Sequence, residues 1–491
     1  MNYPLVIRLL GYMCLAISAA FLISLGVGFL YPDTDSESQA IAGFGYSIAI
    51  SASIGTVLAY LGRNAKNRMF RKEAFALIGV SWFVCSTIGA LPYLFAMPGT
   101  SLADAFFEST SGLTTTGASV FTDFESWPRS LLFWRSFSQW IGGLGVVVFF
   151  VALLSSLGAG AKILFTNESS AASTDIDTSR VQSGVSKIFA LYVSLTIACF
   201  ICLALAGMSW YDAICHAFTT LATGGFSTRS ASIEAFQSPL IEWIIIFFMA
   251  LGGTSFLWLL KIGSSPFREM SRNSEVKVYF LILTVATLLI AIELFEGNNA
   301  TSLFDSITKS AFQVVSLMTS TGFASADYDT WMMPTKIILL GVMIIGGCSG
   351  STAGGFKVIR LVICIKVAWA QIEKSIRSNL VKTLRVNGRV LKESDQFAVI
   401  SYAVLIGLTT TFSIVAFAAL EHNMSFKSLV AGVCACLYNT GPSFDQLGPT
   451  QNYGHLLPAS KIFLSVLMVM GRLELYAVFA LFAPSLWKKF S

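Results

Sequence analysis

Long apolar runs recur along the whole chain, and they constrain the fold more than any other feature of the sequence. Runs of about 20 residues match the helix length needed to cross the roughly 30 Å hydrocarbon core of a bilayer. Of the 491 residues, 55% are hydrophobic and only 12% are charged, about half the charged fraction usual in soluble domains. The sequence therefore predicts an all-α polytopic membrane protein.

Ten segments are candidate spans, and the eighth is interrupted by glycines. The first is too long for a secretory signal peptide and lacks a cleavage site. Segments rich in Lys and Arg mark the cytoplasmic side of membrane proteins, and here they are 63–73, 261–277 and 357–392. We therefore expect both termini and the polar loop 158–185 to be cytoplasmic. The spans are 5–31, 41–62, 72–96, 131–157, 186–208, 239–262, 277–296, 336–370, 396–420 and 457–484.

Four apolar stretches are too short to cross a bilayer, and each leads into a Thr-Gly dipeptide between two full spans. They are 102–119, 211–228, 304–325 and 424–444. The chain thus repeats one unit four times, consisting of a span, a half-helix, a Thr-Gly loop and a second span.

This repeat predicts how the chain is divided. A two-span extension at the N-terminus precedes four pore repeats, the third of which contains the broken helix. The expected boundaries are 1–62 for the extension and 63–160, 161–265, 266–380 and 381–491 for the repeats.

The Thr-Gly loops predict a cation filter. Irregular backbone at membrane depth is tolerated only where it is buried in protein or borders a water-filled cavity. Four such loops can converge on one axis, where their carbonyl oxygens replace the hydration shell of a cation. The loops carry no carboxylate, which favours a large monovalent cation over Mg²⁺ or Ca²⁺. The predicted filter residues are Thr115, Thr116, Gly117, Ala222, Thr223, Gly224, Ser320, Thr321, Gly322, Asn439, Thr440 and Gly441.

The half-helices support this interpretation, because a helix C-terminus directed at the axis places partial negative charge there. Asp104, Asp212 and Asp305 begin three of them. The first interpretation of these aspartates is that they cap free helix N–H groups, and attraction of cations is the alternative. Asp305 lies further from its glycine than the others, so either the third half-helix is about one turn longer or Asp305 is not equivalent.

At these residues the chain resembles the Trk/Ktr/HKT superfamily, and most closely the membrane subunits of bacterial Trk potassium uptake systems, the TrkH family. The resemblance covers nearly the whole chain, including the two extra N-terminal spans. The motifs that carry it are "DAFFESTSGLTTTGAS" (104–119), "DAICHAFTTLATGGFST" (212–228), "GGCSGSTAGGFKVIR" (346–360) and "GRLELYAVFALF" (471–482).

The resemblance implies four pseudo-repeats around a central pore, with a K⁺ ion bound at the filter as the transported ion and no covalent cofactor. It also implies a homodimer in the bacterial inner membrane and a cytosolic nucleotide-binding regulatory subunit. By resemblance the filter glycines are Gly117, Gly224, Gly322 and Gly441. In related plant proteins a serine at the first position accompanies sodium preference, so Gly117 favours potassium. The fourth loop departs from the pattern at Asn439 and Pro442.

The interruption of the eighth span predicts a gate. Five glycines and three Ser or Thr residues within 346–355 are incompatible with a stable helix. A phosphate-binding loop is excluded, because the segment lacks Gly-Lys-Ser/Thr and follows a membrane helix. We expect a flexible hinge beneath the filter, and the resemblance implies a gating loop here. The gate residues are Gly346, Gly347, Cys348, Ser349, Gly350, Ser351, Thr352, Ala353, Gly354 and Gly355, together with Arg472.

Arg472 and Glu474 lie in the middle of the last span, where a charge is costly unless it faces the protein interior. On one helix, positions i and i+2 would point away from each other. For Glu474 we expect a salt bridge between helices. For Arg472 we expect a position below the filter that repels cations, with a structural salt bridge as the alternative.

The function that follows is potassium uptake through a gated, selective pore, and ammonium stays open as a substrate. The alternative is a secondary transporter that couples K⁺ to Na⁺ or H⁺, for which the few candidate carboxylates are Glu474, Glu293 and the half-helix aspartates. An enzyme is not expected, because no His, Cys and Asp constellation is present. The basic segment 371–392 is either a topology signal or a docking surface for a partner, and nothing indicates nucleic-acid binding.

Overall fold

The structure is a computed structural model that describes residues 1–32, 35–66, 71–143, 145, 178–262, 273–297, 300–377, 383–387 and 389–484. The second half of the predicted span 131–157 and most of the predicted loop 158–185 lie outside these residues. The last residues of that loop begin helix α9 (Thr178–Leu205) instead. Parts of the three basic segments also lie outside the described residues.

The protein is a polytopic helical membrane protein, as predicted. Within the described residues, six helices are long and apolar enough to cross a membrane, or eight if each of two bent pairs counts as one span. The β-structure described there is a short antiparallel hairpin of β1 (Arg385–Val386) and β2 (Arg389–Val390). Large exposed apolar side chains such as Leu281 and Phe412 cover the long helices, as expected of surfaces that face lipid.

Four repeats make up most of the chain. Each begins with a long helix, followed by a shorter helix that ends at a Thr-Gly loop. The long helices are α3 (Arg71–Gly89, continued by α4, Leu91–Ala96), α9, α14 (Ser274–Glu296) and α18 (Glu393–Leu420). The half-helices are α5 (Leu102–Leu113), α10 (Trp210–Leu221), α15 (Leu303–Met318) and α19 (Phe426–Leu437).

After each loop a short 3₁₀ turn leads into the second helix of the repeat. The turns are η1 (Phe124–Ser126), η2 (Ser232–Phe236), η3 (Tyr328–Thr330) and η4 (Asp445–Leu447). The second helices are α6 (Arg129–Gly143), α11 (Pro239–Gly252), α16 (Met333–Ile345) and α20 (Pro458–Arg472). The last three are followed after a break by α12 (Phe256–Ile262), α17 (Val358–Ile376) and α21 (Tyr476–Phe482).

The break predicted in the eighth span is confirmed, because α16 and α17 are separated by irregular backbone. Two other spans were predicted to be continuous, and this was wrong. The chain bends by 102° between α11 and α12 and by 119° between α20 and α21. The second bend contains Glu474 in the left-handed region, with φ of 54°. The sequence had suggested that Arg472 and Glu474 lie on one continuous helix. Instead, α20 ends at Arg472 and Glu474 lies in the bend.

All four half-helices begin with the same serine cap. Ser101, Ser209 and Ser302 accept a hydrogen bond from the backbone N–H three residues on, and Ser425 does so in the fourth repeat. The aspartates predicted to be caps occupy that third position instead, as in an Ser-x-x-Asp capping box. Helix α15 has 16 residues against 12 in the other three, which confirms the extra turn and keeps Asp305 equivalent.

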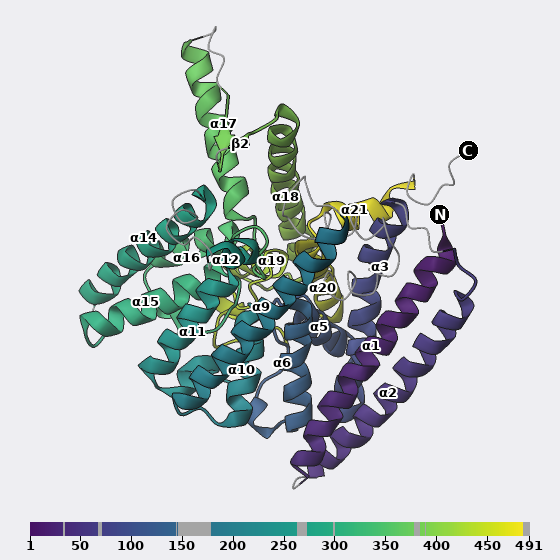
Figure 1. Ribbon diagram of the computed structural model, residues 1–491. Coiled ribbons are helices and arrows are strands. Elements are labelled where there is room, and N and C mark those ends of the chain that lie inside the picture. The colour runs from purple at the N-terminus through teal and green to yellow at the C-terminus, as the bar shows by residue number, and fades with distance from the viewer. Residues whose placement is uncertain are drawn as a thin grey trace.

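Helices α1 (Tyr3–Leu30) and α2 (Asp35–Leu61) form an antiparallel pair at one side of the molecule (Figure 1). They pack outside the repeats, and α1 contacts α3 and α6. The start of α1, helix α21 and the far end of α17 all lie at the upper end of the molecule in Figure 1. At that end α17 and the β-hairpin project beyond the helical body.

Gly11 allows α1 and α2 to pack closely. A Cβ atom at Gly11 would lie 2.6 Å from the Ala59 backbone nitrogen and 2.7 Å from the Gly55 carbonyl oxygen. Real Cβ atoms essentially never approach other atoms within 3.0 Å. Small residues commonly bring membrane helices together in this way.

We predict that Gly11→Leu separates α1 from α2 and lowers the melting temperature of the detergent-purified protein by about 1–3 °C, because overpacking costs about 1–3 kcal/mol and the unfolding entropy of a chain of this length is about 1 kcal/mol/K. Gly26→Leu on the same helix is the matched control, since a Cβ there meets nothing within 4 Å. Equal melting temperatures for the two variants would contradict the close contact. Thermal unfolding followed by fluorescence makes the measurement.

Candidate functional site

The four Thr-Gly loops have the same backbone conformation, and each follows a half-helix directly. We define loop 1 as 114–119, loop 2 as 222–227, loop 3 as 319–324 and loop 4 as 438–443. The second residue of each loop has a left-handed backbone, with φ between 52° and 56°. These residues are Thr115, Thr223, Ser320 and Asn439. Left-handed geometry is uncommon for residues other than glycine and costs about 1–3 kcal/mol each.

Each half-helix ends in a Schellman motif, in which two N–H groups past the helix end bond back to its last turn. In loop 1, Thr115 N donates to Gly112 O at 3.0 Å and Thr116 N donates to Ser111 O at 2.9 Å. The same pair of bonds recurs in the other loops, including Thr440 N to Ala435 O at 2.8 Å. The motif uses carbonyls of the last helical turn and turns the chain sharply away from the helix axis.

The repeated conformation changes the register of loop 2. The fourth residue of each loop is a glycine with φ between 77° and 89°, and in loop 2 this is Gly225. Gly224, the glycine assigned from the sequence, occupies the place that Thr116 holds in loop 1. Ala222 correspondingly matches Thr114. Two adjacent glycines made the sequence assignment ambiguous, and the hydrogen bonds resolve it, because Gly224 N donates to Thr219 O as Thr116 N does to Ser111 O.

The four loops meet through contacts between a glycine of one loop and a carbonyl of the next. A Cβ on Gly117 would overlap Gly224 O, one on Gly225 would overlap Thr321 O, one on Gly322 would overlap Thr440 O, and one on Gly441 would overlap Thr116 O. The contacts run from loop 1 to 2, 2 to 3, 3 to 4 and back to 1. The loops therefore form a closed ring, and we call the oxygens of Thr116, Gly224, Thr321 and Thr440 the ring oxygens.

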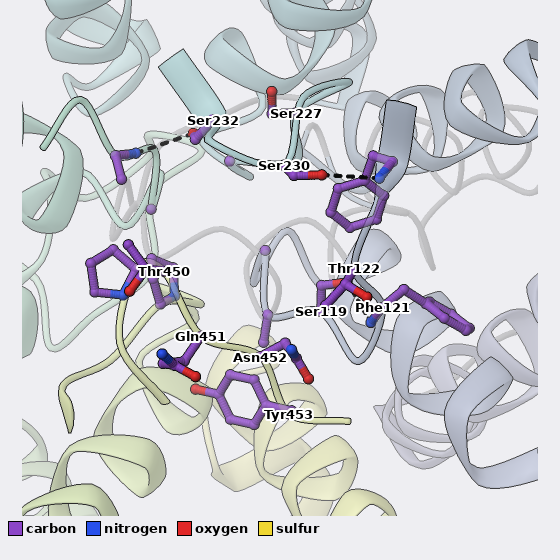
Figure 2. Close-up of a pocket in the computed structure, with 18 of the residues that line it drawn as sticks. Ser119, Phe121, Thr122, Ser227, Ser230, Ser232, Thr450, Gln451, Asn452 and Tyr453 are labelled. Atoms are coloured by element: carbon purple, nitrogen blue, oxygen red, sulfur yellow. Dashed lines mark hydrogen bonds between the residues drawn. The ribbon is translucent and has the colours of Figure 1, made fainter. Parts of the chain in front are cut away.

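A pocket opens on one side of the ring, and we call it the vestibule. Its wall includes Gly117, Gly225 and Gly322 from the ring and the segment 447–453 from the fourth repeat. Figure 2 shows its polar lining, in which labelled side chains of the first, second and fourth repeats surround the opening. The labelled residues are Ser119, Phe121, Thr122, Ser227, Ser230, Ser232, Thr450, Gln451, Asn452 and Tyr453.

Glu125 lies beside this vestibule and joins the first two repeats. It accepts hydrogen bonds from the backbone N–H of Ser230 at 2.9 Å and from the Ser230 hydroxyl at 2.5 Å. Desolvation acts to raise the pKa of Glu125, but the hydrogen bonds from Ser230 outweigh it and lower the pKa below its ordinary value. The carboxylate is therefore charged at neutral pH.

A buried ion pair supports loops 1 and 2 from behind. Arg135 of α6 donates through Nε to Glu108 of α5 at 2.6 Å, and the two side chains are 3% and 0% exposed. Arg135 also donates to Ser227 O at 2.9 Å, and its guanidinium lies 3.6 Å from the ring centre of Phe226. Glu108 in turn accepts from the Val120 N–H. Loss of either partner would leave a buried charge uncompensated.

This pair was missed in the sequence analysis. The signal was present, because Arg135 lies within a predicted span and Glu108 within a predicted half-helix. Ionisable residues at membrane depth indicate a paired or functional position by default.

The irregular segment 346–357, which we call the intramembrane segment, crosses the other side of the ring. Thr352 Oγ1 donates to Leu221 O at the end of α10, at 3.0 Å. Gly354 N donates to the Ser320 hydroxyl in loop 3. A Cβ on Gly354 would overlap Tyr438 O in loop 4. The vestibule is lined by ring glycines and by residues that follow them, whereas the intramembrane segment contacts residues that precede the ring glycines in loops 3 and 4, together with the ends of α10 and α11. The ring therefore lies between the two.

The predicted gate residues are brought together at this place. Cys348 N donates to Gly253 O at 2.8 Å, and Ser349 N donates to Glu275 at 2.5 Å. These bonds attach the segment to the α11–α12 bend and to the start of α14. The segment is thus held at several points although it contains no regular structure.

Arg472 fastens the intramembrane segment to the first repeat. Its guanidinium donates to Thr352 O at 2.8 Å, to Gly142 O at 2.6 Å and to Gly143 O at 3.0 Å. Glu474 accepts from Arg360 of α17 at 2.5 Å, which confirms the predicted salt bridge between helices. The two charges therefore act on different neighbours.

No group of three or more His, Cys, Asp or Glu side chains that could hold a metal ion is found among the described residues. Cys199 and Cys202 both lie on the apolar helix α9.

Comparison with known proteins identifies the family. A model of the TrkH family, described as cation transport protein, matches residues 40–489. The Trk system potassium uptake protein TrkH of Escherichia coli K12 is 32% identical over 492 residues, which is 100% of both chains. The Trk system potassium uptake protein TrkI of Halomonas elongata is 31% identical and covers 95% of this chain and 94% of its own.

A solved structure agrees with this result. The crystal structure of the potassium transporter TrkH from Vibrio parahaemolyticus matches with a TM-score of 0.88 and 31% identity, over 99% of this chain and 100% of that one. The family is one of transport proteins rather than enzymes. The chain belongs to the TrkH family of cation transport proteins.

Proposed function

We propose that this protein takes up potassium through a gated pore whose narrowest part is the ring of four loops. The closed cycle of glycine–carbonyl contacts carries this proposal, since it brings one backbone oxygen from each repeat to a common place. Backbone carbonyls arranged in this way can replace the hydration shell of a cation. The names of the relatives, which are potassium uptake proteins, support K⁺ as the ion.

The chemistry of the ring favours a monovalent cation. Loops 1–4 contain hydroxyl, amide and backbone oxygens and no carboxylate. Four half-helices end at the ring, and the C-terminus of each contributes partial negative charge. The charge available is therefore diffuse, which suits K⁺ better than a divalent ion.

The intramembrane segment is the proposed gate. It lies on the side of the ring opposite the vestibule and contains five glycines within 346–355. Arg472 places a positive charge next to it and holds it against α6 through Thr352, Gly142 and Gly143. A cation leaving the ring would meet both obstacles. Opening then requires that these hydrogen bonds break and that the segment moves aside.

We propose passive conduction rather than coupling to Na⁺ or H⁺. Glu474, one of the few candidate carboxylates for a coupled mechanism, is engaged by Arg360. The proposed ring contains no titratable group. Coupled transport would appear as potassium flux that depends on a second ion gradient.

We propose further that the chain acts as a homodimer in the bacterial inner membrane, with both termini cytoplasmic, and with a cytosolic nucleotide-binding subunit. Relatives are named as parts of a Trk system. The far end of α17 and the β-hairpin project at the same end of the molecule as the start of α1, which suits a docking surface in the cytoplasm (Figure 1).

We predict that Gly117→Ser lowers the preference for K⁺ over Na⁺, because the new side chain must displace Gly224 O. The measurement is ⁸⁶Rb⁺ uptake into proteoliposomes with K⁺ or Na⁺ as competitor. Gly99→Ser is the matched control, since Gly99 has a similar φ of 89° but a Cβ there meets nothing within 4 Å. A Gly117→Ser protein with unchanged selectivity would contradict the role of the ring.

We predict that Arg472→Ala raises basal ⁸⁶Rb⁺ flux in the absence of any cytosolic partner, because it removes three hydrogen bonds to the gate region and a positive charge from the pathway. Arg63→Ala, at an exposed position just after α2, controls for loss of a positive charge elsewhere. Basal flux equal to that of the unmodified protein, in a folded variant, would refute the gating role.

A further inference from the structure

Loop 2 differs from the other three loops at the residue before its left-handed glycine. Loops 1, 3 and 4 have a threonine at this position, namely Thr116, Thr321 and Thr440, whereas loop 2 has Gly224. The backbone of Gly224 does not have positive φ, so its conformation does not require a glycine. Something other than backbone strain must explain the missing side chain.

Gln139 of α6 occupies the space that a threonine side chain would take. A Cβ on Gly224 would overlap the Cδ and Oε1 atoms of Gln139 and would lie 2.8 Å from its Nε2 atom. Gln139 is 0% exposed, although it belongs to the first repeat and loop 2 to the second. The exchange of threonine for glycine in loop 2 is thus matched by a side chain from the neighbouring repeat.

The amide of Gln139 makes two hydrogen bonds to loop 2. Its Nε2 donates to Gly224 O at 2.6 Å, and its Oε1 accepts from the Phe226 N–H at 3.1 Å. Because the Phe226 N–H can only donate, the amide orientation is determined by its partners. Gln139 therefore clamps loop 2 on both sides of Gly225.

Gly224 O is one of the four ring oxygens, and the clamp makes it different from the others. Across the residues that the structure describes, no hydrogen bond reaches the oxygens of Thr116, Thr321 or Thr440. A carbonyl oxygen has two lone pairs, so Gly224 O can accept from Gln139 and still face a cation. Its position is fixed by a side chain, whereas the other three oxygens are positioned by their backbone and packing.

We propose that Gln139 is a positioning residue that holds the second ring oxygen in place and so contributes to the discrimination between K⁺ and the smaller Na⁺. A Na⁺ ion needs the surrounding oxygens to move closer to it than K⁺ does. An oxygen held from behind by a donated hydrogen bond resists that movement. This inference rests on the proposed potassium pathway and adds a selectivity determinant outside the four loops.

The first test compares Gln139→Leu with the unmodified protein. The substitution keeps most of the side-chain volume and removes both hydrogen bonds. The measured quantity is the concentration of Na⁺ that halves ⁸⁶Rb⁺ uptake, divided by the concentration of K⁺ that does so. We expect this ratio to fall by about tenfold, the equivalent of one lost hydrogen bond to a buried group. Gln313→Leu is the matched control, because Gln313 is also 0% exposed and its amide has no hydrogen-bond partner within the described parts of the chain.

A second test uses the exchange that the four loops suggest. Gly224→Thr alone forces a side chain into Gln139 and is expected to reduce both the yield of folded protein and flux. Gln139→Ala/Gly224→Thr removes the obstacle and gives loop 2 the sequence pattern of the other loops. We expect the double variant to recover folding and to be more selective for K⁺ than Gly224→Thr. Two mutations with independent effects would not produce this recovery.

The outcomes separate the inference from the function on which it rests. An unmodified protein that does not prefer K⁺ over Na⁺ overturns the proposed function. A selective unmodified protein with equally selective Gln139→Leu overturns the inference alone. If Gln139→Leu does not fold, the double variant decides, and a double variant no better than Gly224→Thr overturns the inference.

Discussion

The contact between a glycine of one loop and a backbone carbonyl of the next is the constraint on which the rest of this structure depends. Backbone that is not helical must be enclosed by protein or water at membrane depth, and here each loop is enclosed by its neighbours. Gly117, Gly225, Gly322 and Gly441 leave no room for a side chain. Each half-helix ends at a loop of the ring, and a serine caps the opposite end of each half-helix.

The backbone follows fourfold pseudosymmetry, but the side chains that support it do not. Arg135 and Gln139 lie one turn apart on α6 and both bond loop 2. Asn439 of loop 4 donates to the Thr116 hydroxyl in loop 1, and Tyr328 donates to Ser443 O in loop 4. A single chain with four unlike repeats can thus support its loops with different side chains, which four identical subunits could not do.

The sequence predicted the elements whose signal is local. Span length, the four half-helices and the break at 346–355 follow from hydrophobic runs and from five glycines in ten residues. The bends before α12 and α21 were not predicted, because the apolar runs resume beyond Gly252–Ser255 and beyond Arg472 and Glu474, and each run with its interruption was taken as one span. The register of loop 2 was also misassigned, because the Thr-Gly dipeptide is Thr223–Gly224 whereas the glycine with positive φ is Gly225. The partners of Arg135 and Gln139 lie 27 to 92 residues away, beyond any local pattern.

The most direct test of the account is to locate the ion. Crystals of the protein grown with Rb⁺ in place of K⁺ should give an anomalous scattering peak on the axis of the ring, within coordination distance of the oxygens of Thr116, Gly224, Thr321 and Thr440. Crystals grown with Na⁺ and then soaked in Rb⁺ should show the same peak. Rb⁺ bound elsewhere in the membrane region, with no peak between these four oxygens, would contradict the claim that the ring is the cation site.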